Sequence, residues 1–297
     1  MPTVSVIVPN YNHAPYLKQR IESILRQTFQ DFELVLLDDC STDGSREIIE
    51  SYRGNPHMSH IVYGEANSGS AFRQWKKGIE LAQGEWVWVA ESDDWADASF
   101  LEGMVLAATT HPESVLISST PKYVFPDGST WCRQTDGETC EISGQSFVSQ
   151  HLLTGNSLTN VSALLMRRES LMQVDFRPAE SMKLCGDWYL YTQLCMYGSV
   201  VEIHKPLSHF RQHSDSTSAT AERSGLALIE GADILSFLTT NFHLSPAQYA
   251  RPWGRTWAKQ EKKYHYNRLT RKQISRKMRR FHSIRMWHVI YRLKYLL

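Results

Sequence analysis

The stretch Gly84–Asp97, with the sequence GEWVWVAESDDWAD, constrains the fold of this chain more than any other. Its apolar run Trp86–Ala90 is typical of a strand that is buried on both faces of a sheet. Three carboxylates, Glu91, Asp93 and Asp94, follow within four residues. Because ligands of open α/β sheets bind beyond the carboxyl ends of the strands, we expect a ligand site at this acidic cluster.

The acidic cluster favours a hard divalent cation. Carboxylates this close in sequence repel one another unless a cation or solvent separates them. Oxygen ligands at this density favour Mg²⁺ or Mn²⁺, which usually leave coordination positions open for substrate phosphates. A solvated acidic turn or a helix N-cap is the alternative that the pattern alone leaves open.

The apolar segments of the first third of the chain predict alternating strands and helices. The expected strands are Val4–Pro9, Glu33–Leu37, His60–Tyr63 and Trp86–Ala90, and the helices between them are 15–28, a segment with Ile48, Ile49 and Tyr52 inward, and 71–82. This alternation implies βαβ units and a mostly parallel sheet. The acidic pair Asp38–Asp39 and the acidic cluster would then lie side by side at strand ends.

The length of 297 residues, 42% of them hydrophobic, allows one large core and a smaller appendage. No stretch approaches the roughly 18 apolar residues of a membrane span, and Val4–Val8 is too short for a secretory signal, so we expect a cytoplasmic protein. Five cysteines without a CxxC pair indicate neither a disulfide framework nor a zinc knuckle.

The last 47 residues differ from the rest in charge. Residues 251–297 hold 15 Lys or Arg against the single acid Glu261, a balance of +14 in a chain whose net charge is +1. From Ala221 onward the pattern is wholly helical, so we divide the chain into a catalytic domain, 1–220, and a helical region, 221–297, that is basic from 251. The asymmetry indicates that the tail meets an anionic partner: a membrane, a nucleic acid or the acidic body itself.

Five segments in chain order resemble the family 2 glycosyltransferases. They are Val4–Asn12, Asp38–Ser45, Asn67–Ser70, Gly78–Glu85 and Glu91–Asp94. Each segment alone is a weak signal, but the ordered set is specific. The resemblance implies an α/β chain with the GT-A (nucleotide-diphospho-sugar transferase) fold: a mostly parallel central sheet flanked by helices, with a helical basic C-terminal extension. It also implies inverting transfer of a sugar from a nucleotide-diphosphate sugar to a hydroxyl group, with Mn²⁺ or Mg²⁺ as cofactor.

For the nucleotide, the resemblance implies that Pro9 and Tyr11 lie at the base and ribose and that Asp39 accepts a hydrogen bond from the base. The chemistry agrees, because a carboxylate accepts from the imide N–H of uracil or thymine and an aromatic ring stacks on a base. A UDP- or dTDP-sugar is therefore expected. Capping of the next helix is the alternative for Asp38 and Asp39, and we assign that cap to Asp43.

Glu91, Ser92 and Asp93 occupy the position of the family's DxD motif, with Asp93 the direct metal ligand by resemblance. Glu91 replaces the usual Asp, and it reaches either a ribose hydroxyl or a metal-bound water. The segment 72–76, FRQWK, departs from the Ala-Arg-Asn core of many relatives. Arg73 within it would steady the diphosphate, and an exposed helix cation is the alternative.

Asp187 lies in Cys185–Trp188, which resembles the family's Glu-Asp-Trp segment, and takes the position of the catalytic base. Gly186 stands where relatives usually have Glu, and a helix N-cap is the alternative for Asp187. His213 lies in Phe210–Ser216, which resembles the late Tyr-Arg-x-His segment. The resemblance implies that His213 ligates the metal or contacts the diphosphate, and a structural histidine is the alternative.

Three other functional classes are the alternatives to a glycosyltransferase. A catalytically silent sugar-nucleotide or glycan-binding subunit is the rival, against which the presence of Asp93 and Asp187 argues. No GxGxxG follows the first strand and no GxxxxGK[ST] occurs, which disfavours an oxidoreductase and an NTPase. We expect a glycan or lipid-linked acceptor in cell-surface polysaccharide biosynthesis and no nucleic-acid partner. Donor and acceptor choice depends on loops such as Asn156–Asn160 and Arg177–Leu184, which carry no readable code.

The basic tail has apolar residues at helical spacing. They are Ile274, Met278, Phe281 and Ile284, then Met286, Val289, Ile290, Leu293 and Leu297. A basic amphipathic helix could lie on an anionic surface, such as the inner face of the cell membrane, where a lipid-linked acceptor would be found. A helix packed against the catalytic body or a second subunit is the equally supported alternative.

Overall fold

The computed structural model describes residues 1–213 and 223–296, and within them the chain is built on one ten-stranded mixed sheet. The strands are β1 (Val4–Asn10), β2 (Phe32–Asp38), β3 (Met58–Tyr63), β4 (Trp86–Val89), β5 (Trp95–Ala96), β6 (Ser114–Val124), β7 (Thr130–Trp131), β8 (Thr139–Ser143), β9 (Leu164–Arg167) and β10 (Ser199–Arg211). Their order is β3-β2-β1-β4-β9-β6-β10-β5, with β7 on β6 and β8 on β10.

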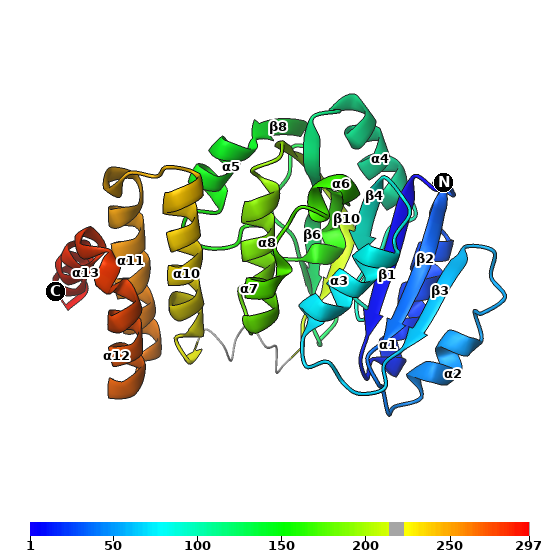
Figure 1. Ribbon diagram of the computed structural model, residues 1–297, viewed down its shortest axis with the longest axis horizontal. Coiled ribbons are helices and arrows are strands. Elements are labelled where there is room, and N and C mark those ends of the chain that lie inside the picture. Colours follow the sequence, from blue (N-terminus) through cyan, green and yellow to red (C-terminus); the bar gives the residue numbers. More distant parts are fainter. Residues whose placement is uncertain (214–222, 297) are drawn as a thin grey trace.

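Helices cover the sheet and continue beyond it (Figure 1). They are α1 (Ala14–Leu25), α2 (Ser45–Glu50), α3 (Ala71–Leu81), α4 (Phe100–Thr110), α5 (Gly144–His151), α6 (Arg168–Leu171), α7 (Phe176–Ser181), α8 (Gly186–Leu194), α10 (Leu226–Asn241), α11 (Pro246–Tyr264), α12 (Arg268–Lys277) and α13 (His282–Leu296), with short 3₁₀ turns η1 (Val161–Ala163) and η2 (Met278–Arg280).

The parallel half of the sheet is as expected, and it sets the position of the acidic residues. β1 is buried along its length and pairs in parallel with both β2 and β4, so these strands end at one edge. The expected neighbours Asp38–Asp39 and Glu91–Asp94 therefore lie on the same edge, but on either side of β1 rather than directly side by side. Beyond β4, β9 runs antiparallel to its neighbours, and β10 is parallel to β6.

The two faces of the sheet belong to two separate cores, because successive strand residues point to opposite faces. Trp86 and Trp88 of β4 pack in the core under α1 and α4, whereas Val87 and Val89 pack in the core under α3 and α8. This explains why the run 86–90 is apolar throughout. A strand that is buried on both faces then delivers its carboxylates at a fixed point.

The C-terminal helices α10–α13 stack beyond α7 and α8, at the end of the molecule away from β3 (Figure 1). They share the core of α8: the rings of Trp188 and Trp253 stack at 6.2 Å, and the Trp253 indole N–H donates to the Leu153 carbonyl (2.7 Å). The expected domain boundary near residue 220 lies outside the described residues. Within the described residues, no helix has both the length and the apolar character needed to cross a membrane.

Candidate active site

The carboxylates that follow β4 lie in surroundings that disfavour their charge. Burial and the charge of Asp93 raise the pKa of Glu91 to about 8, although the Trp75 indole N–H donates to its Oε1 (2.8 Å). Burial and Asp93 likewise raise the pKa of Asp94 to about 6. The cluster therefore carries negative charge that protein and water together stabilise poorly, and an added cation would lower its energy.

Arg20 is a fully buried cation beneath this cluster, and the sequence reasoning missed it. Its Nε donates to the Glu91 carbonyl (2.8 Å), its guanidinium lies 5.4 Å from the centre of the Trp88 ring, and its terminal nitrogens have no hydrogen-bond partner among the described residues. The signal was present, because Arg20 shares the inward face of α1 with Leu17 and Ile24. An arginine at a core position indicates a buried anion nearby.

Asp93 and His213 lie in direct contact: His213 Nε2 is 2.9 Å from Asp93 Oδ2. The two residues are 120 positions apart in sequence and both line one cavity of about 830 Å³. An imidazole and a carboxylate brought together in this way are suitable ligands for a divalent cation such as Mn²⁺. Ser214–Ser216, the end of the sequence segment that pointed to His213, lie outside the described residues.

Three hydrogen bonds fix the loop that carries Asp93. Asp94 accepts the backbone N–H of Arg211 (2.9 Å) and the Asn160 amide (2.9 Å). The Arg211 guanidinium donates to the Asp93 carbonyl (2.8 Å) and lies between the rings of Tyr16 and Trp95, 4.6 and 4.8 Å from their centres. Arg211 therefore holds the loop in position, and it also lines the cavity.

A second cavity of about 830 Å³ is lined by several of the expected nucleotide-binding residues. These are Pro9, Tyr11, Asp39, Glu91 and Ser92. Tyr11 is 47% exposed, so its ring is open to a ligand. Ser92 is buried, and its hydroxyl lies 2.8 Å from His13 Nδ1. Both cavities are lined by His13 and Leu184, and they therefore adjoin.

Asp39 lines the nucleotide-side cavity, but its carboxylate already accepts several hydrogen bonds. Ser68 donates its backbone N–H (3.0 Å to each oxygen) and its hydroxyl (2.8 Å), and Gln74 donates its amide (2.6 Å). Asp39 thus shapes the loop before α3 and retains little free acceptor capacity. Asp43 accepts the N–H of Ser45, the first residue of α2, in line with the capping role expected for it.

Arg73 lies in α3 between Phe72 and Gln74, which line the nucleotide-side cavity. Its side chain is 55% exposed, donates to the Ser68 carbonyl (2.9 Å) and lies 3.7 Å from the Glu180 carboxylate. These contacts brace the loop before α3 against α7. They hold the Arg73 guanidinium away from the centre of the cavity.

Asp187, in the first turn of α8, lines the same cavity as Asp93 and His213. Its Oδ2 accepts the Asn156 amide (2.7 Å), and its Oδ1 accepts the N–H of Trp188 (2.7 Å). Burial raises the pKa of Asp187 to about 6, against the effect of these two hydrogen bonds. At neutral pH the group is mostly ionised and more basic than an ordinary Asp, which suits a general base.

Glu230 of α10 holds the segment just before Asp187, and no sequence motif pointed to it. Its buried carboxylate accepts three successive backbone N–H groups, those of Lys183 (2.9 Å), Leu184 (3.1 Å) and Cys185 (2.9 Å). A carboxylate that binds N–H groups at a helix start satisfies donors that have no partner in the helix. The C-terminal region thereby fixes the position of Asp187.

Gly186 leaves room for an aromatic ring. A Cβ atom at this position would lie 2.4 Å from the ring of Phe72, a residue of α3 that lines the nucleotide-side cavity. A glutamate at position 186 is therefore incompatible with the observed position of Phe72.

Comparison with known proteins places these residues in a family context. A family model described as glycosyl transferase family 2 matches residues 5–175. Glycosyltransferase GlyG of Streptococcus pneumoniae serotype 4 is 27% identical over 225 residues, which are 73% of each chain. A Bacillus subtilis (strain 168) protein provisionally named the teichuronic acid biosynthesis glycosyltransferase TuaG is 43% identical over 93 residues, 31% of this chain. That match spans only 36% of TuaG.

Two solved structures share the fold. The crystal structure of S. aureus TarS 1–349 in complex with UDP-GlcNAc has a TM-score of 0.64 at 21% identity, over 98% of this chain and 89% of TarS 1–349. The mannosyltransferase PcManGT from Pyrobaculum calidifontis, in complex with GDP-Man and Mn²⁺, has a TM-score of 0.57 at 17% identity, over 98% and 87% of the two chains. The chain thus has the GT-A fold that its sequence predicts.

We predict that Glu230→Gln loosens the segment before Asp187. A neutral amide has one acceptor oxygen in place of two charged ones, and hydrogen bonds to a charged group contribute about 1.5–3 kcal/mol each. Loss of one such bond corresponds to roughly 10–150-fold faster opening, so the amides of residues 183–185 should exchange hydrogen faster by that factor. Hydrogen–deuterium exchange with mass spectrometry measures this, with the exposed Glu169→Gln as control. Unchanged protection at 183–185 would contradict the role of Glu230.

Proposed function

The chain belongs to glycosyl transferase family 2, and on that premise we propose that it transfers one sugar, with inversion, from a UDP- or dTDP-sugar to a hydroxyl group. The acceptor is a glycan or a lipid-linked glycan of a cell-surface polysaccharide. Relatives named for teichuronic acid biosynthesis and for poly(ribitol-phosphate) N-acetylglucosaminyl transfer support this class of acceptor. The UDP-GlcNAc bound to TarS supports a nucleotide-sugar donor.

The observation that carries the proposal is the junction of the two cavities. Pro9, Tyr11 and Ser92 line the first, Asp187 lines the second, and His13 and Leu184 line both. A donor whose nucleotide lies in the first cavity would present its sugar at the junction. An acceptor hydroxyl in the second cavity would then lie beside the Asp187 carboxylate.

A divalent cation fits the residues at this junction. Asp93 and His213 supply a carboxylate and an imidazole in contact with each other. Burial and Asp93 raise the pKa of the neighbouring Glu91 to about 8, and a bound cation would favour its ionised form. We assign Asp93 and His213 as the residues that would hold Mn²⁺ or Mg²⁺. When bound, such an ion neutralises charge on a departing diphosphate. The exposed Lys183 lines the nucleotide-side cavity and is a cation that could meet the diphosphate there. Arg73 lies between Phe72 and Gln74, which line the same cavity.

Asp187 acts as the general base in this proposal. Its carboxylate accepts the proton of the acceptor hydroxyl while that oxygen forms the new bond to the anomeric carbon and the bond to the diphosphate oxygen breaks. Asn156 and the N–H of Trp188 hold both carboxylate oxygens in place. A single displacement of this kind inverts the anomeric centre, and no second carboxylate has been identified as a nucleophile.

Two experiments distinguish the proposed transferase from its rival, a catalytically silent subunit that binds sugar nucleotides or glycans. A thermal-shift screen of UDP-, dTDP- and GDP-sugars with and without Mn²⁺ identifies the donor, because a ligand that binds only the native state raises its stability. Donor hydrolysis or transfer by the purified protein then distinguishes an enzyme from a binding subunit. Donor binding with no turnover, in the presence of varied acceptors, would favour the rival.

We predict that Asp187→Asn lowers turnover by about 10²–10⁴-fold, the usual contribution of a general base, and leaves donor affinity unchanged. Because the pKa of Asp187 is raised to about 6, the wild-type turnover should rise with pH through that value and level off above it, as the carboxylate loses its proton. Turnover of the Asp187→Asn variant should not show this rise with pH. Calorimetry measures donor binding, and a coupled diphosphate-release assay measures turnover. Wild-type turnover in the variant would remove Asp187 from the mechanism.

We predict that Asp93→Asn weakens Mn²⁺ binding by more than the roughly 10–100-fold typical of losing an outer-shell partner. The electron paramagnetic resonance signal of free Mn²⁺ measures binding directly, without an activity assay. Asp97→Asn is the matched control, because Asp97 also contacts a histidine, His209, at 2.9 Å. Equal Mn²⁺ affinity in the two variants would show that Asp93 is not a ligand.

We also propose that α13 contacts an anionic membrane surface. The inner set of tail residues is buried: Ile274, Met278, Phe281 and Ile284 belong to the core of the protein. The outer set is exposed where the structure describes it: Met286 is 56%, Val289 54%, Ile290 44% and Leu293 60% accessible, and Leu297 lies outside the described residues. Basic side chains on the same helix, Arg285, Arg292 and Lys294, are exposed as well. Such a helix surface binds anionic lipid through apolar burial and charge together.

We predict that the double substitution Val289→Glu/Leu293→Glu releases the protein from vesicles that contain phosphatidylglycerol. Each Glu removes apolar contact and adds repulsion, and high salt should release the wild type in the same way. Sedimentation with vesicles measures binding. Leu269→Glu is the control, since Leu269 is 73% exposed but lies on α12. Wild-type protein that does not sediment, or a double variant that does, would exclude this contact.

A further inference from the structure

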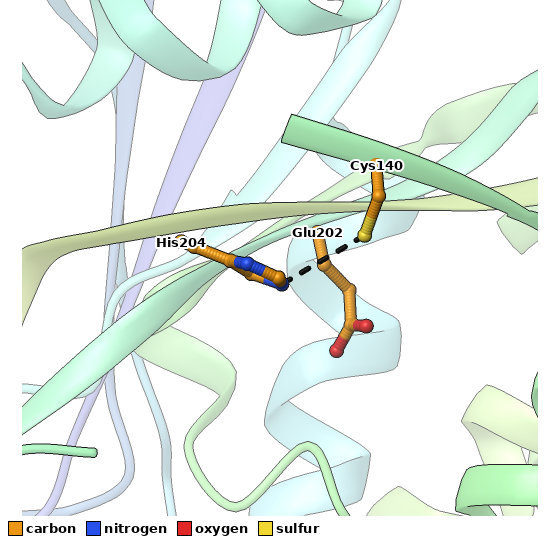
Figure 2. Close-up of side chains that lie close together, drawn as sticks. All are labelled: Cys140, Glu202 and His204. Atoms are coloured by element: carbon orange, nitrogen blue, oxygen red, sulfur yellow. Dashed lines mark hydrogen bonds between the residues drawn. The ribbon is translucent and has the colours of Figure 1, made fainter. Parts of the chain in front are cut away.

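Three side chains of metal-binding type lie together on the strand pair β8–β10, outside the proposed active site (Figure 2). Cys140 of β8 lies opposite Glu202 of β10 in the antiparallel register, and His204 follows two residues later on the same strand. Residues two apart on a strand share a face, so all three side chains are on one side of the sheet. Their ligand atoms all lie within 4.8 Å of one another.

The spacing of two of these atoms matches a tetrahedral zinc site. The distance from Cys140 Sγ to His204 Nε2 is 3.7 Å (dashed line in Figure 2). Zinc bonds of about 2.3 Å to sulfur and about 2.0–2.1 Å to nitrogen, at a tetrahedral angle, place these atoms about 3.6 Å apart. The two side chains therefore need almost no movement to share one Zn²⁺ ion.

His204 is also held in the orientation that a metal ligand requires. Its Nδ1 lies 2.8 Å from Asp136 Oδ1, and the same oxygen accepts the N–H of Glu138 (3.0 Å), which fixes the carboxylate. A proton on Nδ1 that is donated to Asp136 leaves the lone pair on Nε2, the atom that faces Cys140. Histidines that bind zinc almost always donate their other N–H to a carboxylate, a carbonyl or water in this manner.

The charge and the surroundings of the cluster also suit a dication. Glu202 and Asp136 place two carboxylates around one imidazole and one thiol, and Lys or Arg contacts with these carboxylates are not among the ion pairs of the described residues. Glu202, His204 and Asp136 line a cavity of about 250 Å³, which Arg133 also lines, so water reaches the Glu202 and His204 side of the cluster.

We propose that Cys140, Glu202 and His204 bind one Zn²⁺ ion, with Asp136 as the outer partner of His204 and water in the fourth position. Sulfur and imidazole ligands together select zinc over Mg²⁺ or Mn²⁺, which prefer oxygen ligands. This ion is distinct from the one assigned to Asp93 and His213, where sulfur is lacking. Bound zinc joins β8 to β10 and stabilises the segment between β7 and β8 against the sheet.

The test uses Co²⁺ as a spectroscopic substitute for Zn²⁺ in the full chain after removal of metal with a chelator. Thiolate–cobalt coordination gives an intense near-ultraviolet charge-transfer band, which a carboxylate–imidazole site cannot give. We expect this band to saturate at one equivalent, to disappear when Zn²⁺ is added, and to be absent in Cys140→Ser and His204→Gln. Cys132→Ser, which changes a neighbouring cysteine outside the cluster, should keep it.

Two further measurements keep the test decisive if a variant folds poorly. Asp136→Asn, at an exposed position, should weaken Zn²⁺ binding by about 10–100-fold in competition with a chromophoric chelator. Zn²⁺ should raise the melting temperature of the wild type but not that of Cys140→Ser. Absence of the thiolate band in the wild type, or an equal band in Cys140→Ser, would overturn the proposal. So would Zn²⁺ affinity that is lost in Asp93→Asn instead.

Discussion

Negative charge at the end of a buried strand is the constraint on which this structure depends. β4 is covered on both faces, and in the loop after it Asp94 is buried while Glu91 and Asp93 are only partly exposed. The consequence is a raised pKa for both Glu91 and Asp94, and a fully buried arginine, Arg20, beneath them. Burial in turn lowers the pKa of Arg20 to about 10. A site with this charge arrangement is preorganised for a cation, because a cation removes the repulsion that the fold imposes.

The loop after β4 is held in place from three directions, each by a different part of the chain. Arg20 binds it from α1, Asn160 from the turn before η1, and Arg211 from the end of β10. Glu230 does the same for the start of α8. The loop after β4 and the start of α8 carry groups that would bind a donor, a metal and an acceptor, and contacts from distant parts of the chain thereby fix the two segments relative to one another. The helical C-terminal region is accordingly part of the site through α10.

The sequence was sufficient for the parallel strands and, through the family resemblance, for the GT-A fold, because motifs at strand and helix ends report position directly. Asp93, His213 and Asp187 were named separately from the sequence, and the structure brings them to one cavity. It was insufficient where the determining contact is distant in sequence. Glu230 meets the backbone of 183–185, which has no side-chain signature, and Cys140 meets His204 from 64 positions away with no compact spacing. The basic tail is a second case in which the sequence pattern was insufficient. The spacing of its apolar residues predicted one amphipathic helix, whereas in the structure some of these residues are buried and others are exposed.

Two of the departures from the family pattern, Phe72 and Gly186, are linked by one packing constraint. The Phe72 ring occupies the space that a Cβ at 186 would require, at 2.4 Å from it, and Phe72 also lines the nucleotide-side cavity. Phe72, which lines the nucleotide-side cavity, thus limits the size of the residue at position 186, next to Asp187 of the other cavity. A side chain at 186 would require the half-buried Phe72 ring to leave its observed position.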